Sequence, residues 1–146
     1  MNNNIDQKLE NQLCFPLYAT SRLVTRLYQP LLEEHNLTYP QYIILLILWE
    51  KEGITVGEIG QQALLNSNTL TPILKRMQHS GLITRQQDED DDERKIFIFL
   101  TPSAKQLQQT LACLPSQLIS KIDFDANKEK QLKTLLQELM QSLENS

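Results

Sequence analysis

The chain has 146 residues, of which 40% are hydrophobic and 22% charged, and its formal net charge is −4. This length suits one domain with its own core, and the composition is that of an ordinary globular protein. No apolar run approaches the roughly 18 residues of a membrane span. The polar start, MNNNIDQKLE, does not resemble a signal peptide. We therefore expect a cytoplasmic protein with no membrane partner.

The residue types that bind metals are scarce. The chain has two cysteines, Cys14 and Cys113, and two histidines, His35 and His79. None of them forms a CxxC pair, so we expect no metal site and no cofactor. In a reducing compartment the two cysteines are expected to be thiols at rest. The negative net charge argues weakly against nucleic acid as a partner, although local patches decide phosphate contact.

The first 53 residues predict two helices. Leucines recur near helical spacing from residue 13 to residue 35, with Pro16 in the first turn or at a kink and Asn36 at the end. The almost wholly apolar stretch LTYPQYIILLILWE then predicts a buried helix, capped by Thr38 or Tyr39 and stopped by Gly53.

Two shorter helices follow. Thr55 and Glu58 have the spacing of a capping box and predict a helix of about two turns. The next helix opens at Asn66 or Ser67 and closes at Gly81. We expect its inner stripe to consist of Leu70, Ile73, Leu74 and Met77. Two short helices joined by a brief polar turn indicate a helix-turn-helix.

The pattern then changes from helix to strand. Two β-rich runs, 82–85 and 95–100, flank a very acidic loop at 88–93, which predicts a β-hairpin. A hairpin directly after a helix-turn-helix is typical of a winged helix. Thr101 and Pro102 begin another helix, which we expect Pro115 to end or bend.

The last helix is capped by Asp125, and one apolar stripe runs along it. The stripe consists of Leu132, Leu135, Leu136, Leu139, Met140 and Leu143. An apolar stripe on a terminal helix must pack against another surface, so we expect this helix to have a partner. We expect a mainly α fold in a single domain, 1–146. A winged helix-turn-helix spans about 38–101, and helices at about 11–36 and 101–145 flank it and form a dimerisation domain.

Several collinear stretches carry a family resemblance. They include LCF-LYA-SR, YQPLLEEHNLTYPQY, LLILWE and DERKIFIFLT, within residues 11–101. The wing segment also has the pattern Asp92, Arg94, Leu100, Thr101. On these residues the chain resembles the MarR family of transcription regulators, and within it the organic hydroperoxide resistance regulators. Residues 102–146 match in helical pattern only.

The resemblance implies a function and its partners. It implies a homodimeric repressor that binds double-stranded, pseudo-palindromic operator DNA while reduced. An organic hydroperoxide, as effector, would oxidise one cysteine and release the DNA. The sensing cysteine of that subfamily maps onto Cys14, and the tyrosines that hold it from the other subunit map onto Tyr28 and Tyr39. Tyr18 and Phe15 are further candidates for the sensor pocket. Either Cys113 or a low-molecular-weight thiol would resolve the oxidised cysteine.

The position of Cys14 also has chemical meaning. The default interpretation of a lone cysteine is a small buried hydrophobe. A thiol in the first turn of a helix, however, feels the positive end of the helix dipole, which favours the thiolate that peroxides attack. The product is a sulfenic acid, which is reversible when a thiol condenses with it.

The DNA-binding residues are predicted from the helix-turn-helix and the wing. Residues 67–95 carry five basic and six acidic groups, so charge alone does not indicate DNA binding. We expect the polar start of the second short helix to contact base edges, and its later cations and the wing to contact phosphate or the minor groove. The candidates are Ser67, Asn68, Thr69, Thr71, Lys75, Arg76, Arg85, Asp92 and Arg94.

Two other functions remain open at this stage. The first keeps the family but replaces the trigger: a small phenolic ligand releases the repressor with no cysteine chemistry. The second is an enzyme, a thiol peroxidase that turns over hydroperoxides. The chain has no obvious resolving pair or basic residue beside Cys14, so we predict that it is not an enzyme.

Overall fold

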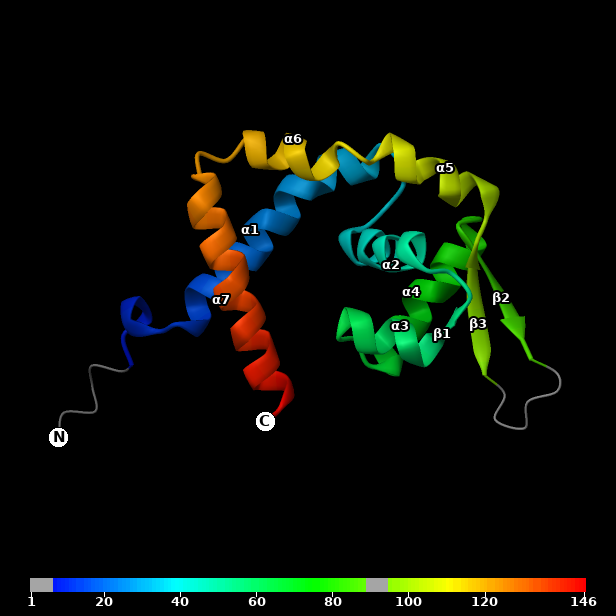
Figure 1. Ribbon diagram of the computed structural model, residues 1–146, viewed down its shortest axis with the longest axis horizontal. Coiled ribbons are helices and arrows are strands. Elements are labelled where there is room, and N and C mark those ends of the chain that lie inside the picture. The colour runs from blue at the N-terminus through cyan, green and yellow to red at the C-terminus, as the bar shows by residue number, and fades with distance from the viewer. Residues whose placement is uncertain (1–6, 89–94) are drawn as a thin grey trace. The chain divides into compact units, whose positions relative to one another are not determined.

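The computed structural model describes residues 7–88 and 95–146. These residues form two compact units, up to residue 112 and from residue 113 onward, and each is described by itself. Figure 1 shows the order of the elements along the chain. The first unit contains η1 (Leu9–Asn11), α1 (Cys14–Glu33), α2 (Tyr39–Glu50), β1 (Ile54–Thr55), α3 (Val56–Ala63), α4 (Ser67–His79), β2 (Ile83–Gln87), β3 (Ile96–Leu100) and α5 (Pro102–Thr110). The second contains α6 (Leu114–Ser120) and α7 (Ala126–Glu144).

The helix starts follow from local chemistry, as predicted. Thr38 caps α2: its hydroxyl accepts from the Gln41 N–H at 3.3 Å, and the Gln41 side chain accepts from the Thr38 N–H at 3.2 Å. Thr55 and Glu58 form the same reciprocal box at the start of α3. Helix α1 begins at Cys14, so Pro16 lies in the first turn, where its missing N–H costs nothing.

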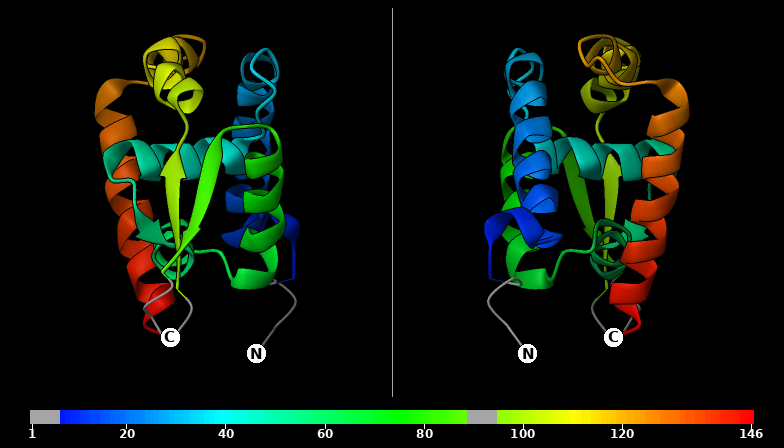
Figure 2. Two further views of the ribbon diagram at one scale, coloured as in Figure 1. Left: turned by 90° about the vertical axis from the view of Figure 1, so that its right-hand side faces the viewer. Right: turned by 90° about the vertical axis from the view of Figure 1, so that its left-hand side faces the viewer.

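The sheet has three antiparallel strands in the order β1-β3-β2, and Figure 2 shows β2 and β3 side by side. Ile98 of β3 is central, because it pairs with both Ile54 and Arg85. Ile98 and Leu100 are buried, whereas Phe97 and Phe99, which alternate with them, belong to the opposite face and are half-buried. The two-residue strand β1 was not predicted, because a segment that short leaves no alternation in the sequence.

The core of the first unit is built mainly from side chains of α2, α4 and the sheet. α2 is apolar nearly all round, which is typical of a helix enclosed by its neighbours. The most fully enclosed side chains are Leu32, Ile44, Leu45, Leu48, Ile59, Leu70, Leu74, Met77, Ile83 and Ile98. The predicted inner stripe of α4 is thus confirmed, except that Ile73 is only half-buried.

One expectation about the helices after the wing is wrong. Pro115 does not end or bend the helix that starts at Pro102, because α5 already ends at Thr110. Pro115 instead lies in the first turn of a separate helix, α6, where proline fits without losing a hydrogen bond. The last helix is as predicted: Asp125 caps α7 and accepts from the Asn127 N–H at 2.9 Å.

No helix in the described part of the chain is long and apolar enough to cross a membrane.

Candidate functional site

The start of α4 presents the polar residues that were predicted to contact DNA. Asn66 is the N-cap, and its side chain accepts from the Thr69 N–H at 2.9 Å. Ser67, Asn68 and Thr69 are exposed, and so are Lys75 and Arg76 further along. The opposite, apolar side of α4 is buried and fixes the helix, so the polar side faces outward.

A hollow of about 400 Å³ lies where α3, α4 and the wing meet. It is lined by Thr55, Val56, Gly57, Thr71, Arg85, Lys95 and Ile96. Two of these, Thr71 and Arg85, were predicted DNA contacts. The fold therefore brings Thr71 of α4 and Arg85 of the wing strand β2 together. Two cations beside the first backbone N–H groups of a helix suit a phosphate group.

Lys95 was missed by the sequence analysis, because it borders the acidic run and its charge is outweighed there. Lys95 joins Arg85 in the lining of this hollow because β2 and β3 pair as a hairpin. Asp92 and Arg94, the other two wing candidates, lie outside the described residues.

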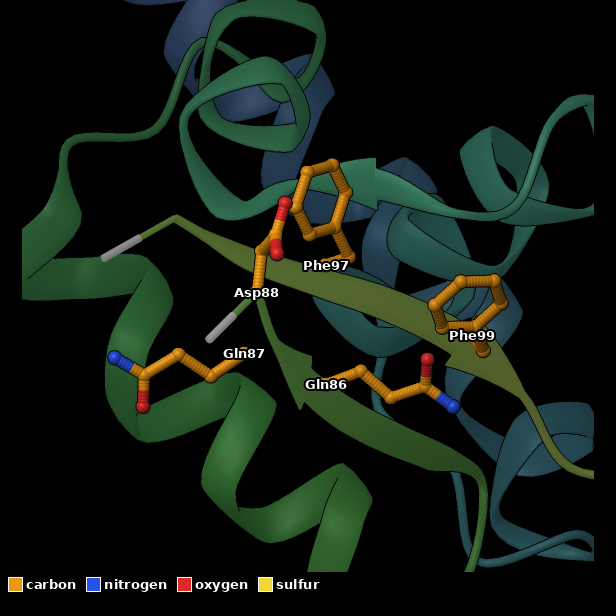
Figure 3. A pocket seen from close by; sticks show the side chains of 5 residues that line it. All are labelled: Gln86, Gln87, Asp88, Phe97 and Phe99. Carbon is orange, nitrogen blue, oxygen red and sulfur yellow. The ribbon is translucent and has the colours of Figure 1, made fainter. Parts of the chain in front are cut away.

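The other face of the wing has a different character (Figure 3). A hollow of about 320 Å³ there is lined by Gln86, Gln87, Asp88, Phe97 and Phe99. The charged residue in this lining is Asp88, whose carboxylate would repel a phosphate group. Of the two faces, the one with Arg85 is therefore the better candidate for DNA.

Cys14 is the first residue of α1 and is exposed. The preceding residue, Leu13, provides no side-chain cap, so the first N–H groups of the helix have no cap from that position. Phe15 and Tyr18 are exposed as well, and the Arg22 guanidinium lies 5.4 Å from the centre of the Tyr18 ring. In the single chain the sensor candidates on α1 are accessible to solvent.

Tyr28 and Tyr39 form an aromatic cluster together with Tyr42. The ring centres lie 5.0 Å apart for Tyr28 and Tyr39, 5.8 Å for Tyr28 and Tyr42, and 6.3 Å for Tyr39 and Tyr42. Burial raises the pKa of all three phenols, and the neighbouring phenols raise the pKa of Tyr28 further. All three hydroxyls therefore remain protonated near neutral pH and retain an O–H that can donate a hydrogen bond.

Two aromatic residues here, Tyr42 within the cluster and Trp49 beside it, were not predicted as site residues. Tyr42 is almost fully buried, and its ring centre lies 6.3 Å from that of Trp49 in an edge-on arrangement. The sequence does indicate this contact, because Tyr42 and Trp49 are seven residues apart and such residues share one face of a helix. The stretch is so apolar throughout that Tyr42 and Trp49 do not stand out from its other hydrophobic residues.

Cys14 is far from Tyr28 and Tyr39 of its own chain. α1 runs without interruption from Cys14 past Tyr28, and 14 residues of helix correspond to about 21 Å. The fold therefore brings Tyr28 and Tyr39 together but leaves Cys14 at the other end of the helix. Cys113, the candidate resolving cysteine, is also exposed and directly precedes α6 in the second unit. Among the described residues, no three His, Cys, Asp or Glu side chains gather as a metal site requires.

Helices α3 and α4, the turn between them and the hairpin of β2 and β3 define the class of the protein. The turn is tight: Leu64 has a left-handed φ of 54°, and the Leu65 N–H donates to the Gly60 carbonyl at 3.0 Å. A helix-turn-helix with an exposed polar second helix, followed by a wing, is a winged helix-turn-helix DNA-binding domain. The predicted fold class is confirmed.

Comparison with known proteins identifies the family. The family model described as transcriptional regulator SarA/Rot matches residues 26–111. The organic hydroperoxide resistance transcriptional regulator of Bacillus subtilis is 47% identical over 144 residues, which cover 98% of this chain and 97% of that protein. The chain therefore belongs to the MarR/SarA-type winged-helix regulators, as the sequence indicated, and it is similar to the organic hydroperoxide resistance regulators among them.

Solved structures agree with this assignment. Reduced AbfR bound to DNA, from a protein of Staphylococcus epidermidis, superposes with a TM-score of 0.83 at 35% identity, covering 97% of this chain and 96% of that one. The disulfide-formed state of AbfR gives a TM-score of 0.63 at 38% identity, covering 94% and 90%. These relatives are transcriptional regulators, so the chain is a DNA-binding transcriptional regulator and not an enzyme.

Proposed function

We propose that the chain is a homodimeric repressor that senses organic hydroperoxides through Cys14 and releases operator DNA when Cys14 is oxidised. The observation that carries this proposal is the exposed thiol of Cys14 at the uncapped start of a 20-residue helix. A buried cysteine would be inert packing, whereas a thiol at this position is accessible to a peroxide.

The chemical step is a two-electron oxidation of sulfur. The sulfur of Cys14 attacks the peroxide O–O bond, so an S–O bond forms, the O–O bond breaks and an alcohol leaves after taking up the thiol proton. The resulting sulfenic acid condenses with a second thiol, releasing water and forming a disulfide. That thiol is Cys113 or a low-molecular-weight thiol. The exposed Leu13 and Phe15 on either side of Cys14 favour an apolar peroxide.

The tyrosines support a site shared between two subunits. Tyr28, far along α1, and Tyr39 of α2, which lies against it, retain protonated hydroxyls but are too far from Cys14 of their own chain to reach it. In a homodimer they would donate hydrogen bonds to Cys14 of the partner. The α7 stripe supports a dimer as well, because Leu135 is 62% exposed and Leu143 64% exposed in the chain alone.

The relatives support the same conclusion. The Bacillus subtilis protein is named for organic hydroperoxide resistance, and AbfR has been solved reduced on DNA and in a disulfide-formed state. The DNA side is the start of α4, with Ser67, Asn68 and Thr69, and the hollow with Thr71, Arg85 and Lys95. A dimer would present two such surfaces to the two halves of a pseudo-palindrome.

The test is a DNA-release assay. A duplex selected by the reduced protein from random sequence is titrated with wild type and with Cys14→Ser and Cys113→Ser variants. One equivalent of cumene hydroperoxide is then added, followed by a reductant. Wild type is expected to release the DNA and to bind it again after reduction, and Cys14→Ser is expected to remain bound. Release by the Cys14→Ser protein would refute the sensor role and favour a ligand-triggered repressor.

The Cys113→Ser variant separates the two resolving routes. If Cys113 resolves, wild type forms a disulfide between Cys14 and Cys113 after one equivalent of peroxide, and this variant does not. If a small thiol resolves, Cys113→Ser behaves as wild type, and release requires that thiol in the buffer. Sedimentation of a Leu135→Glu, Leu143→Glu variant tests the dimer: we expect a monomer, whereas Lys133→Glu on the same helix should leave the dimer intact.

A further inference from the structure

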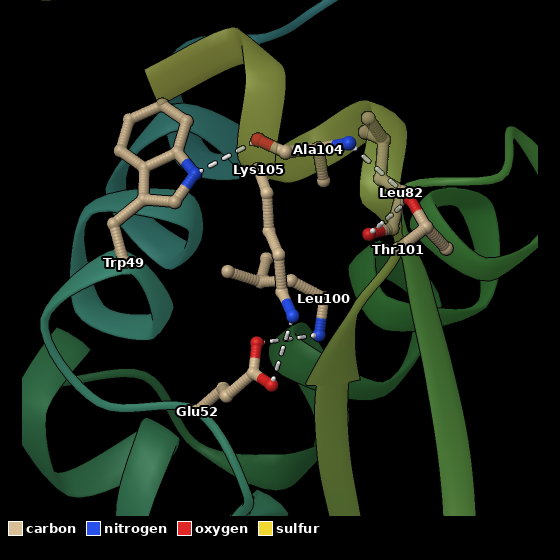
Figure 4. Close-up of polar contacts among 7 residues, drawn as sticks. All are labelled: Trp49, Glu52, Leu82, Leu100, Thr101, Ala104 and Lys105. Carbon is tan, nitrogen blue, oxygen red and sulfur yellow. Dashed lines mark hydrogen bonds and ion pairs between the residues drawn. The ribbon is translucent and has the colours of Figure 1, made fainter. Parts of the chain in front are cut away.

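A group of contacts joins the end of α2 to the start of α5 (Figure 4). The Trp49 indole N–H donates to the Ala104 carbonyl at 2.9 Å. One Glu52 carboxylate oxygen lies 3.5 Å from the Lys105 Nζ, and the other accepts from the Leu100 N–H at 3.4 Å. We call these five residues the α2–α5 clamp.

The start of α5 is in turn tied to the wing. Thr101 caps α5, and its hydroxyl accepts from the Ala104 N–H at 3.3 Å. The same hydroxyl also donates to the Gly81 carbonyl at 2.6 Å, and the Thr101 N–H donates to the Leu82 carbonyl at 3.0 Å. Gly81 and Leu82 join α4 to β2. The first turn of α5 is therefore tied to the end of α4 and to the start of β2, and we expect the three to move together.

The other end of α2 belongs to the tyrosine cluster. Tyr39 is the first residue of α2, and Tyr42, one turn later, contacts both Tyr28 and Trp49. The helix has 12 residues, closed at its start by the capping box, and is held by the buried Ile44, Leu45 and Leu48. A short helix packed in this way shifts as one body of about 18 Å. A displacement of Tyr39 is therefore carried to Trp49.

We propose that Trp49 is a positioning residue for regulation: its hydrogen bond to Ala104, assisted by Glu52, couples the tyrosine cluster to the wing, and it breaks when Cys14 is oxidised. This inference rests on the proposed function, because it needs Tyr28 and Tyr39 to respond to the state of a partner's Cys14. The intact clamp holds the wing and α4 in the arrangement that binds DNA. Opening it frees the wing to turn without unfolding the unit.

The contacts are of a kind that a switch can use. One is a neutral hydrogen bond, the second is an ion pair whose lysine is 57% exposed, and the third is the long hydrogen bond of 3.4 Å from the Leu100 N–H to Glu52. All three are weak enough to open and close in the folded protein. The buried leucine and isoleucine side chains hold the rest of α2 together as one body. The clamp is thus the part of the α2–α5 interface that has two states.

The chain contains its own reporter, because Trp49 is its one tryptophan. The fluorescence of the DNA-free protein is recorded before and after one equivalent of cumene hydroperoxide, in parallel with the DNA-release assay. We expect a red shift of the Trp49 emission in wild type and none in Cys14→Ser. If wild type releases DNA with unchanged emission, the coupling is refuted while the proposed function stands. If wild type does not release DNA even with a low-molecular-weight thiol in the buffer, both fail.

A variant tests the coupling without fluorescence. Trp49→Phe keeps an aromatic ring and removes the donor. The readout is the ratio of the DNA dissociation constants of oxidised and reduced protein. We expect this ratio to fall roughly fivefold, the value of one neutral hydrogen bond. A merely structural tryptophan would change both constants by the same factor and leave the ratio as in wild type, which would refute the coupling.

Two further variants provide a matched pair. Glu52→Gln removes the charge that faces Lys105, and Glu50→Gln makes the same change at an exposed position two residues earlier. We expect the ratio to fall for Glu52→Gln and to stay as in wild type for Glu50→Gln. If Trp49→Phe does not fold, this pair and the wild-type emission decide the question. Equal behaviour of the two glutamate variants would count against the clamp.

Discussion

The rings of Tyr28 and Tyr39 meet with their centres 5.0 Å apart and their planes inclined by 57°. This contact joins α1, which begins at Cys14, to α2, the helix that reaches the wing. Both phenols have a raised pKa because of burial, so both keep their protons at neutral pH. Two half-buried phenols that keep their protons and lie side by side could donate hydrogen bonds to a sulfur from another subunit.

The first prediction concerns these hydroxyls. Tyr28→Phe and Tyr39→Phe should each slow peroxide-driven DNA release by about ten- to a hundredfold, because a hydrogen bond to a charged group contributes about 1.5–3 kcal/mol. The affinity of the reduced protein for DNA should not change. Stopped-flow fluorescence of labelled operator measures the release rate. Tyr42→Phe is the matched control, since Tyr42 is only 3% exposed and we expect its hydroxyl to stay within its own chain.

The second prediction is a loss of stability at alkaline pH. In the unfolded chain a tyrosine ionises near pH 10, whereas in the folded protein the pKa of Tyr28, Tyr39 and Tyr42 is higher. Above pH 10 the folded state therefore binds more protons than the unfolded state, and the free energy of unfolding falls as pH rises. The contribution is fully present below about pH 10 and is lost as pH rises through the folded-state values.

Urea unfolding at fixed protein concentration, at several pH values from 8 to about 11, measures this effect. Wild type should lose stability more steeply above pH 10 than Tyr28→Phe, because the variant has one such group fewer. Lysines also titrate in this range, but they do so in both proteins, so the difference between the two curves isolates the tyrosine. Parallel curves would show that Tyr28 is not responsible.

The third prediction compares two glycines of α3. A Cβ at Gly60 would lie 2.8 Å from the Leu65 carbonyl oxygen, which is backbone and cannot give way without moving the turn between α3 and α4. A Cβ at Gly57 would meet nothing closer than the Thr55 hydroxyl at 3.9 Å. Gly60→Ala should therefore lower the free energy of unfolding by about 1–3 kcal/mol. Gly57→Ala should raise it by roughly 0.5–1 kcal/mol, through helix propensity. Equal effects in thermal unfolding would contradict this comparison.

Much of the fold was predictable because it depends on short-range chemistry. Thr38, Thr55 and Asp125 mark helix starts through hydrogen bonds to residues two or three positions away, and the sequence states such bonds directly. Pro115 was misread for a related reason. Proline excludes a helix interior but is compatible with both a helix end and a helix start, and only the packed structure chooses between them.

The candidate site was predictable only in part. Cys14 and the polar start of α4 could be identified from their positions in helices and from the family resemblance. Lys95 and the Trp49–Ala104 hydrogen bond depend on chain segments that meet in space, and a single sequence does not record which segments meet. Ala104 contributes a backbone carbonyl, which every residue has, so no residue pattern could have indicated it.

The last prediction concerns the hollow shared by α3, α4 and the wing. Arg85→Gln and Lys95→Gln should each weaken DNA binding, and each should reduce the slope of log affinity against log salt concentration by about 0.9, the value for one phosphate contact. Because phosphates carry no sequence information, the loss should be the same for operator and unrelated duplex. Asn68→Ala at the start of α4 should instead weaken operator binding alone. Lys121→Gln, an exposed cation after α6, is the control. A salt slope that Arg85→Gln and Lys95→Gln leave unchanged would place the phosphate contacts of the wing elsewhere.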